Sequence, residues 1–159
     1  CNTESVKLYQ QRYPALNEQI KYIRNSVDNE VFYPLVTTRR DEGRRALAAQ
    51  MGVSEDTRFL LFAGRLHPQK DPVLLVRSLF ALQQPNIHLL IAGAGELAET
   101  VKAEIAKLGL AGQVTMLGAV PPTQLAKLQQ VCSAFVLTSA YEGLPLVALE
   151  ALACRTPVV

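Results

Sequence analysis

The sequence has few cysteines and no long apolar run. Its 159 residues include only three cysteines, Cys1, Cys132 and Cys154, and no two of them are closely spaced. A disulfide framework is therefore not expected. Cys132 and Cys154 lie in apolar stretches, which is typical of small buried side chains in a reduced, cytosolic protein. No apolar segment approaches the roughly 20 residues that span a bilayer, and residues 1–4 do not open a signal peptide.

Excess charge is also small. Lys and Arg number 16 against 14 Asp and Glu, which gives a net charge of +2. A field this weak does not predict nucleic acid as a partner. Four arginines lie in and just before the polar segment Asp41–Gln50: Arg39, Arg40, Arg44 and Arg45. Their simplest interpretation is a solvated helix face, and the alternative is a role in binding phosphate or a membrane surface. Because 49% of the residues are apolar, one compact domain is expected rather than disorder.

Several motifs of nucleotide and catalytic sites are missing. The chain has neither the full GxGxxG fingerprint of dinucleotide-binding proteins nor the GxxxxGK[ST] phosphate loop. It also lacks a nucleophile elbow and a His/Cys cluster with metal-ligand spacing. These absences disfavour a dehydrogenase, a phosphate-loop nucleotidase and a serine hydrolase, and no metal site is predicted.

From Arg58 onward, short apolar runs alternate with helical stretches, which is the pattern of repeated βαβ units. The expected strands are Arg58–Ala63, Ile87–Ala92, Gln113–Leu117 and Ala134–Leu137, and the expected helices are Asp71 to about Leu82, Glu96–Leu108 and Thr123–Val131. Strands that are apolar throughout predict a sheet covered by helices on both faces. We therefore expect an α/β fold with a Rossmann-like, doubly wound parallel sheet, in which ligands bind beyond the carboxyl ends of the strands.

The two ends of the chain are less regular. Gln19–Ile23 is a candidate for an extra strand, and Asp41–Gln50 resembles a polar helix that ends at Gly52. The final run, Arg155–Val159, is typical of the start of a buried strand, and the sequence stops before the turn that would end such a strand. We therefore expect the chain to be a fragment.

The most unusual segment contains two glutamates that bracket a helix start. Proline favours the first turn of a helix, so the helix should begin near Pro145, with Glu142 in the loop before it and Glu150 inside an otherwise apolar helix. Carboxylates only accept hydrogen bonds and therefore suit sugar or ribose hydroxyls. The helix start between them suits phosphate. The alternatives are a salt bridge from Glu150 to a nearby Arg or Lys and a helix-dipole role for Glu142.

A second candidate site follows the first expected strand. Arg65 and Lys70 lie in the loop after Gly64, where two cations could neutralise a diphosphate and stabilise it as a leaving group. An ordinary basic loop is the alternative, and His67 is interpreted as a loop residue. After the second strand, Gly93-Ala94-Gly95 would permit close backbone approach to a ligand, although a tight turn explains these glycines equally well.

Together these residues resemble the C-terminal, donor-binding domain of the family-four (group 1) retaining GT-B glycosyltransferases. The resemblance extends over roughly Ile20–Val159. The spacing of Glu142 and Glu150 is similar to the E-x7-E motif of that family, and Gly64-Arg65 with Lys70 is similar to its diphosphate-binding loop. Each motif is modest alone, whereas their combination is specific.

The beginning of the resembling region also fits the family. Asn25–Asp28, with Phe32 and Pro34, is similar to the segment that opens the domain after the interdomain linker. The chain departs from the family pattern at Ser26 and Asp71, where glycine is common. Neither departure removes a contact that the resemblance implies.

The resemblance implies a role for each candidate residue. Arg65 and Lys70 would hold the donor diphosphate, Glu142 the transferred sugar and Glu150 the ribose, with Arg65, Lys70 and Glu142 as the catalytic set. The other implied donor-binding residues are Gly64, Gly93, Gly95, Leu117, Gly118, Gly143 and Leu144. The donor would be a UDP- or GDP-type nucleotide sugar, and neither a cofactor nor a metal is implied.

The resemblance also implies how the chain is organised. Residues 1–19 would be a tail or linker from a missing N-terminal domain that binds the acceptor, and residues 20–159 a nucleotide-sugar-binding domain that is incomplete at its C-terminus. The parent enzyme would be cytoplasmic and would transfer a sugar with retention of configuration, and peripheral membrane contact is left open. The isolated chain is expected to be inactive. The alternatives are a nucleotide-sugar epimerase of GT-B-like fold and a non-catalytic, flavodoxin-like binding module.

Overall fold

A parallel sheet forms the centre of the molecule. The computed structural model describes residues 3–159, so Cys1 and the first residues of the expected tail lie outside the described part. The sheet has four strands in the order β3-β2-β1-β4. Their bounds are β1 Arg58–Ala63, β2 Ile87–Ala92, β3 Val114–Gly118 and β4 Ala134–Phe135. All three strand pairs are parallel, which confirms the α/β, Rossmann-like prediction.

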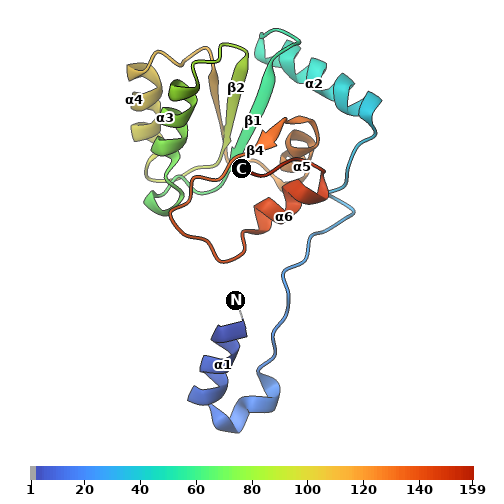
Figure 1. Cartoon of the computed structure of the whole chain (residues 1–159), viewed down its shortest axis with the longest axis vertical. Helices are drawn as coiled ribbons and strands as arrows, with labels where there is room; N and C mark the ends of the chain where they lie inside the picture. The colour runs from blue at the N-terminus through green and yellow to red at the C-terminus, as the bar shows by residue number, and fades with distance from the viewer. Residues whose placement is uncertain (1–2) are drawn as a thin grey trace.

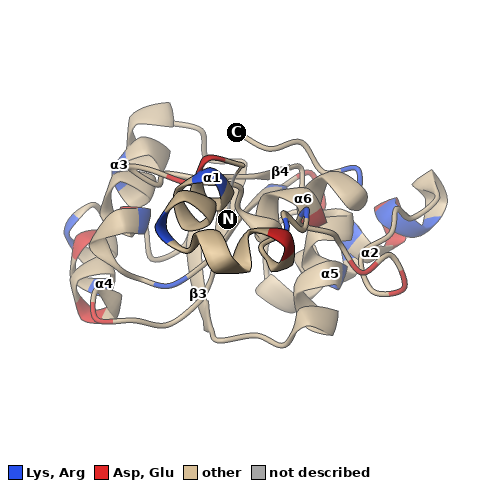
Figure 2. Cartoon of the chain, turned by 90° about the horizontal axis from the view of Figure 1, so that it is seen from below, with Lys and Arg blue, Asp and Glu red and all other residues tan. Residues whose placement is uncertain are grey.

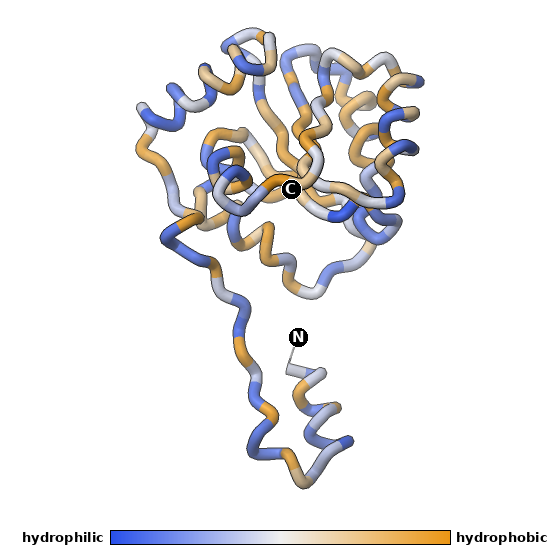
Figure 3. Tube along the Cα trace, turned by 180° about the vertical axis from the view of Figure 1, so that it is seen from behind, coloured by the Kyte–Doolittle hydropathy of each residue, from blue (hydrophilic) through white to orange (hydrophobic). Residues whose placement is uncertain are grey.

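Helices cover both faces of this sheet (Figure 1). One face carries α3 (Pro72–Leu82) and α4 (Ala98–Lys107), and the other carries α2 (Thr37–Met51), α5 (Pro122–Val131) and α6 (Leu146–Ala153). Successive residues of a strand point to opposite faces, so β1 divides its side chains between two cores. Phe62 packs in the first core, whereas Phe59 and Leu61 pack in the second. All three side chains are fully buried, and Figure 3 shows the hydrophobic strands gathered at the centre.

Local sequence signals fix where two important helices begin. The Asp71 carboxylate accepts a hydrogen bond from the Leu74 amide at 3.0 Å, and Pro72 occupies the first turn of α3. This N-cap confirms the predicted helix start. Helix α6 begins directly after Pro145, which leaves Glu142 in the preceding loop as predicted.

Of the two predictions about the ends, one needs correction and one is confirmed. The expected strand over Gln19–Ile23 is wrong, because a 3-10 helix (η1, Pro14–Gln19) precedes an irregular segment in which Ile23 is 83% exposed. A strand requires a neighbour to receive its backbone hydrogen bonds, and this segment has none in the sheet. At the other end, the position of the expected strand start is confirmed, because Val158 bridges Phe135 in parallel and the Val159 amide donates to the Phe135 carbonyl at 2.9 Å.

The N-terminal segment stands away from the sheet. Helix α1 (Thr3–Arg12) and η1 lie below the main body and are joined to it by an extended stretch (Figure 1). Tyr9 and Tyr13 stack on each other with ring centroids 6.4 Å apart. The Asn25 side-chain amide donates to the Leu144 carbonyl at 3.1 Å and ties the extended stretch to the loop before α6. The assignment of residues 1–19 to a preceding domain stays a prediction.

The arginines of α2 do not form one solvated face. Arg39 and Arg45 are exposed, but Arg40 and Arg44 are half-buried, and the Nε atom of each is buried without a hydrogen-bond partner. Arg40 donates to the Cys132 carbonyl at 2.8 Å, at the C-terminus of α5. The solvated-face prediction is therefore wrong for this pair. For Arg40 the reason is that cations suit the carboxyl end of a helix dipole.

The described cysteines are structural. Cys132 and Cys154 are both buried, as predicted, and burial raises the pKa of the Cys132 thiol to about 12. A thiol with so high a pKa is unreactive near neutral pH. Within residues 3–159, no helix is both long and apolar enough to cross a membrane.

Candidate functional site

A cavity of about 510 Å³ lies at the carboxyl ends of β1 and β2. In the strand order β3-β2-β1-β4, β2 and β3 follow on one side of β1, whereas β4 lies on its other side. Open α/β sheets bind ligands at such a reversal of strand order. Residues after the strands and on α6 line the cavity; they include Gly64, Arg65, Lys70, Gly93, Leu146, Val147 and Glu150. The structure therefore brings together both predicted cations and one predicted glutamate.

Glycines allow the two loops at the floor of this cavity to touch. The Gly64 amide donates to Ala92 O at 3.0 Å, and a side chain at Gly93 would collide with the Gly64 carbonyl oxygen. Gly93 also has a φ of +152°, which L-residues rarely adopt. A side chain at Gly95 would likewise meet the carbonyl of Leu66. Contact between the loops thus explains both glycines, and of the two only Gly93 lines the cavity.

Lys70 and Glu142 form an ion pair although 72 residues separate them in the chain. Their side chains are 21% and 22% exposed. The Ser139 hydroxyl donates to the same carboxylate oxygen at 2.7 Å. These hydrogen bonds from Lys70 and Ser139 lower the pKa of Glu142 below its usual value, so this carboxylate is ionised at neutral pH.

Further hydrogen bonds fasten the loop of Glu142 to the loop of Lys70. The Gln69 side-chain amide donates to Tyr141 O at 3.1 Å, and the Ala140 amide donates to Gln69 O at 2.9 Å. The Thr138 hydroxyl donates to Lys70 O at 2.8 Å. The sequence interpretation missed Gln69 and Thr138. The sequence offered one indication of them: Gln69 directly precedes Lys70, and Thr138 lies a few residues before Glu142.

Glu150 is half-buried and lines this cavity. No side chain among residues 3–159 donates a hydrogen bond to its carboxylate or forms an ion pair with it. Burial raises the pKa of Glu150 above its usual value. The alternative of a salt bridge to a nearby Arg or Lys is thus not what the structure contains. A desolvated carboxylate with free acceptor sites is suited to a ligand that brings hydroxyl groups.

The other predicted donor-binding residues lie around or away from the cavity. Gly143 and Leu144 are exposed on the loop before α6 and do not line it. The Gly118 carbonyl accepts from the Gly93 amide at 2.7 Å, and the residues after it, Ala119 and Val120, line the cavity instead. The sequence interpretation missed these two residues because neither carries a polar side chain.

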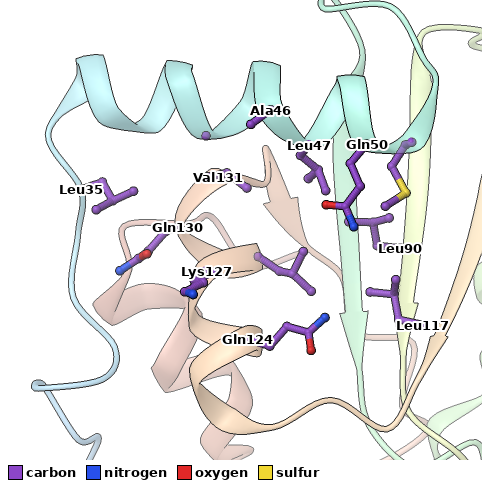
Figure 4. Close-up of a pocket in the computed structure, with 13 residues that line it drawn as sticks. Leu35, Ala46, Leu47, Gln50, Leu90, Leu117, Gln124, Lys127, Gln130 and Val131 are labelled. Carbon is purple, nitrogen blue, oxygen red and sulfur yellow. The ribbon is translucent and has the colours of Figure 1, made fainter.

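Leu117 lies in a different cavity. This second space, of about 360 Å³, is enclosed by α2, α5 and the sheet, and Figure 4 shows Leu117 near Leu90 there. Its lining is mainly apolar, with Lys127 as the charged residue. Basic and acidic residues are otherwise interspersed over the view in Figure 2 rather than gathered in one basic surface. Within the described chain, cations and a free carboxylate therefore converge at the strand ends and not in the second cavity.

Comparison with known proteins identifies the family. The sequence matches the family "Glycosyl transferases group 1" over residues 43–159. This chain belongs to the group 1 glycosyl transferases. The match includes every residue that lines the cavity at the carboxyl ends of the strands. It favours the glycosyltransferase interpretation over an epimerase or a flavodoxin-like module.

Curated relatives of this group 1 chain are longer proteins. It is 34% identical over 156 residues to a D-inositol 3-phosphate glycosyltransferase of Segniliparus rotundus, which covers 94% of this chain and 33% of the relative. It is 32% identical over 153 residues to an alpha-maltose-1-phosphate synthase of Mycobacterium tuberculosis, which covers 92% of this chain and 38% of the relative. The chain thus spans about a third of the length of these relatives.

Solved structures share the fold. The crystal structure of HepE from Anabaena in complex with UDP-glucose superposes with a TM-score of 0.74 at 23% identity, over 96% of this chain and 42% of that protein. The C-terminal domain of a group 1 glycosyl transferase (LpcC) from Francisella tularensis superposes with a TM-score of 0.69 at 19% identity, over 84% of this chain and 69% of that domain. Both likenesses support the Rossmann-like fold of GT-B glycosyltransferases.

Proposed function

We propose that this chain is the donor-binding part of a retaining glycosyltransferase, which transfers a sugar from a UDP- or GDP-type nucleotide sugar to an acceptor. One observation carries the proposal: Arg65, Lys70 and Glu150 converge in one cavity at the carboxyl edge of the sheet, and Glu150 has no partner among residues 3–159. Such a cavity offers positive charge for a diphosphate and an acceptor for ribose hydroxyls. Membership of the group 1 family supports this chemistry.

The donor diphosphate is assigned to Arg65, Lys70 and the start of α6. Negative charge grows on the diphosphate as the bond to the sugar breaks, and fixed cations stabilise that charge. No side chain caps the first turn of α6, so the amides of Leu146 and Val147, which line the cavity, are available to phosphate oxygens. We assign neutralisation of the diphosphate to these protein groups, without a metal ion or other cofactor.

The two glutamates are assigned to the hydroxyl groups of the donor. Glu150 lines the same cavity as the cations and would accept hydrogen bonds from the ribose. Glu142, which contacts Lys70, would accept from the transferred sugar, next to the diphosphate. The backbone of Gly143 and Leu144 follows Glu142 and would complete the sugar contacts. These assignments give each part of a nucleotide sugar, the ribose, the diphosphate and the sugar, its own protein groups.

Retention of configuration is part of the same proposal. The acceptor oxygen then bonds to the anomeric carbon on the face from which the diphosphate departs, so acceptor and cations lie on one side of the sugar. By the family resemblance, an N-terminal domain would hold the acceptor against this cavity. The HepE complex contains UDP-glucose, which supports a nucleotide-sugar donor for a fold of this kind.

Replacing Glu150 with glutamine is expected to raise the stability of the unliganded chain and to lower its affinity for nucleotide. The free energy of unfolding of the unliganded chain should rise by about 0.5–1 kcal/mol, because the substitution removes a desolvated charge that has no partner. The affinity for the nucleoside diphosphate that the chain binds should fall about tenfold, because a charged acceptor for the ribose is lost. Urea denaturation and isothermal titration calorimetry with UDP, GDP and ADP measure the two effects.

Glu104→Gln is the matched control for this substitution. Glu104 pairs with Arg77 at 2.7 Å between α4 and α3, away from the cavity. Its substitution should reduce stability slightly and leave nucleotide affinity unchanged. A Glu150→Gln chain that is less stable than wild type and binds nucleotide equally well would show that Glu150 is a structural residue.

A further inference from the structure

In the empty site, the charges of Lys70 and Glu142 neutralise each other. The Lys70 ammonium contacts the Glu142 carboxylate, and Ser139 adds a hydrogen bond of 2.7 Å to the same oxygen. Both charged side chains are about four-fifths removed from solvent, at 21% and 22% exposure. A phosphate group that approaches Lys70 therefore meets an ammonium that already has an anionic partner.

We propose that Glu142 is an internal competitor for Lys70, and that the donor cavity thereby favours a nucleotide that carries a sugar over a nucleoside diphosphate alone. The inference rests on the proposed function and explains how the same site would select a nucleotide sugar over a nucleoside diphosphate. A diphosphate alone takes the ammonium from Glu142 and leaves the carboxylate with Ser139 as its remaining donor. A nucleotide sugar supplies hydroxyl donors that replace the ammonium at that carboxylate.

The surrounding loop contacts keep the competitor in place. Gln69 holds Tyr141 O through its side chain at 3.1 Å and the Ala140 amide through its backbone carbonyl at 2.9 Å. These bonds join the residue before Lys70 to the residues before Glu142. The carboxylate therefore stays near the ammonium after a phosphate binds, and exchange requires only rotation of two side chains. An unpaired carboxylate held beside a bound diphosphate costs binding free energy through repulsion between like charges.

Glu142→Gln tests the proposal, because it keeps the shape of the side chain and removes its charge. The variant should bind the diphosphate alone about fivefold more tightly than wild type, which is the strength of a partly screened ion pair. It should bind the nucleotide sugar no more tightly than wild type, because the acceptor for the sugar hydroxyls is weakened. Isothermal titration calorimetry with UDP and UDP-glucose, and in parallel with GDP and GDP-mannose, measures both affinities.

Glu96→Gln is the matched control. The Glu96 carboxylate lies 3.7 Å from His67, which belongs to the same loop as Lys70, and the Glu96 side chain is 65% exposed. Its substitution removes the same charge without contacting Lys70, so it measures the general effect of one less negative charge. Circular dichroism confirms that each variant is folded.

Each outcome decides the question. A Glu142→Gln chain that binds the diphosphate alone more tightly than the Glu96→Gln chain, with no gain for the nucleotide sugar, supports the competitor. Unchanged or weaker binding of the diphosphate overturns it, while leaving the donor-binding proposal intact. Failure of the folded wild-type chain to bind any of the four ligands overturns the proposed function itself, and the competitor with it.

Discussion

Replacing Lys70 with alanine is expected to weaken the binding of a nucleoside diphosphate by about 30-fold. Hydrogen bonds that involve a charged group contribute about 1.5–3 kcal/mol, and each 1.4 kcal/mol is a factor of ten in affinity. The substitution also leaves the Glu142 carboxylate without its cation, next to the position that we assign to the phosphates. Isothermal titration calorimetry with the nucleotide that wild type binds measures the loss.

Lys102→Ala provides the control for this result. Lys102 pairs with Glu99 within α4 and is 58% exposed, so its removal changes the net charge equally at a distance from the cavity. Nucleotide affinity should change less than twofold, because exposed pairs are well screened. If Lys70→Ala and Lys102→Ala weaken binding equally, net charge explains the affinity and Lys70 has no specific role.

Replacing Gly93 with alanine is expected to cost about 3 kcal/mol or more in the free energy of unfolding. The added Cβ would collide with the Gly64 carbonyl, which is backbone and cannot rotate away. The φ of +152° adds strain for any L-residue. The loops after β1 and β2 would have to separate, and both line the cavity. Urea denaturation followed by circular dichroism measures the change.

Gly112→Ala is the comparison for Gly93→Ala. No heavy atom lies within 4 Å of a Cβ built on Gly112, outside the glycine and its chain neighbours, and its φ is not in the left-handed region. Its substitution should change the free energy of unfolding by no more than about 0.5 kcal/mol. Equal stability of the two variants would contradict the close approach of the loops at Gly93.

The sequence predicted the sheet and its helices well. The observed bounds of β1 and β2 equal the predicted ones, because each is a short apolar run that a glycine or turn residue bounds on the chain. Proline and an acidic N-cap likewise mark the start of α3. Signals of this kind depend on neighbours in sequence. The strand expected over Gln19–Ile23 failed because a strand also needs a partner, which periodicity does not reveal.

The candidate site was predicted only in part. Strand topology was enough to place Arg65, Lys70 and Glu150 at one edge of the sheet. The pairing of Lys70 with Glu142 and the role of Gln69 depend on loop conformations and on contacts 72 residues apart in the chain. Leu117 was assigned to the donor site by resemblance, but it lines the other cavity because adjacent strand residues point to opposite sides.

Backbone amide NMR of the isotope-labelled chain during titration with UDP and GDP tests the donor-binding account most directly. The account predicts saturable shifts for one of the two nucleotides, confined to residues 64–71, 93–94, 119–120 and 146–150, with the Glu150→Gln chain shifting at higher ligand concentration. Shifts confined to the cavity between α2 and α5, or no shifts in a folded chain, would contradict it.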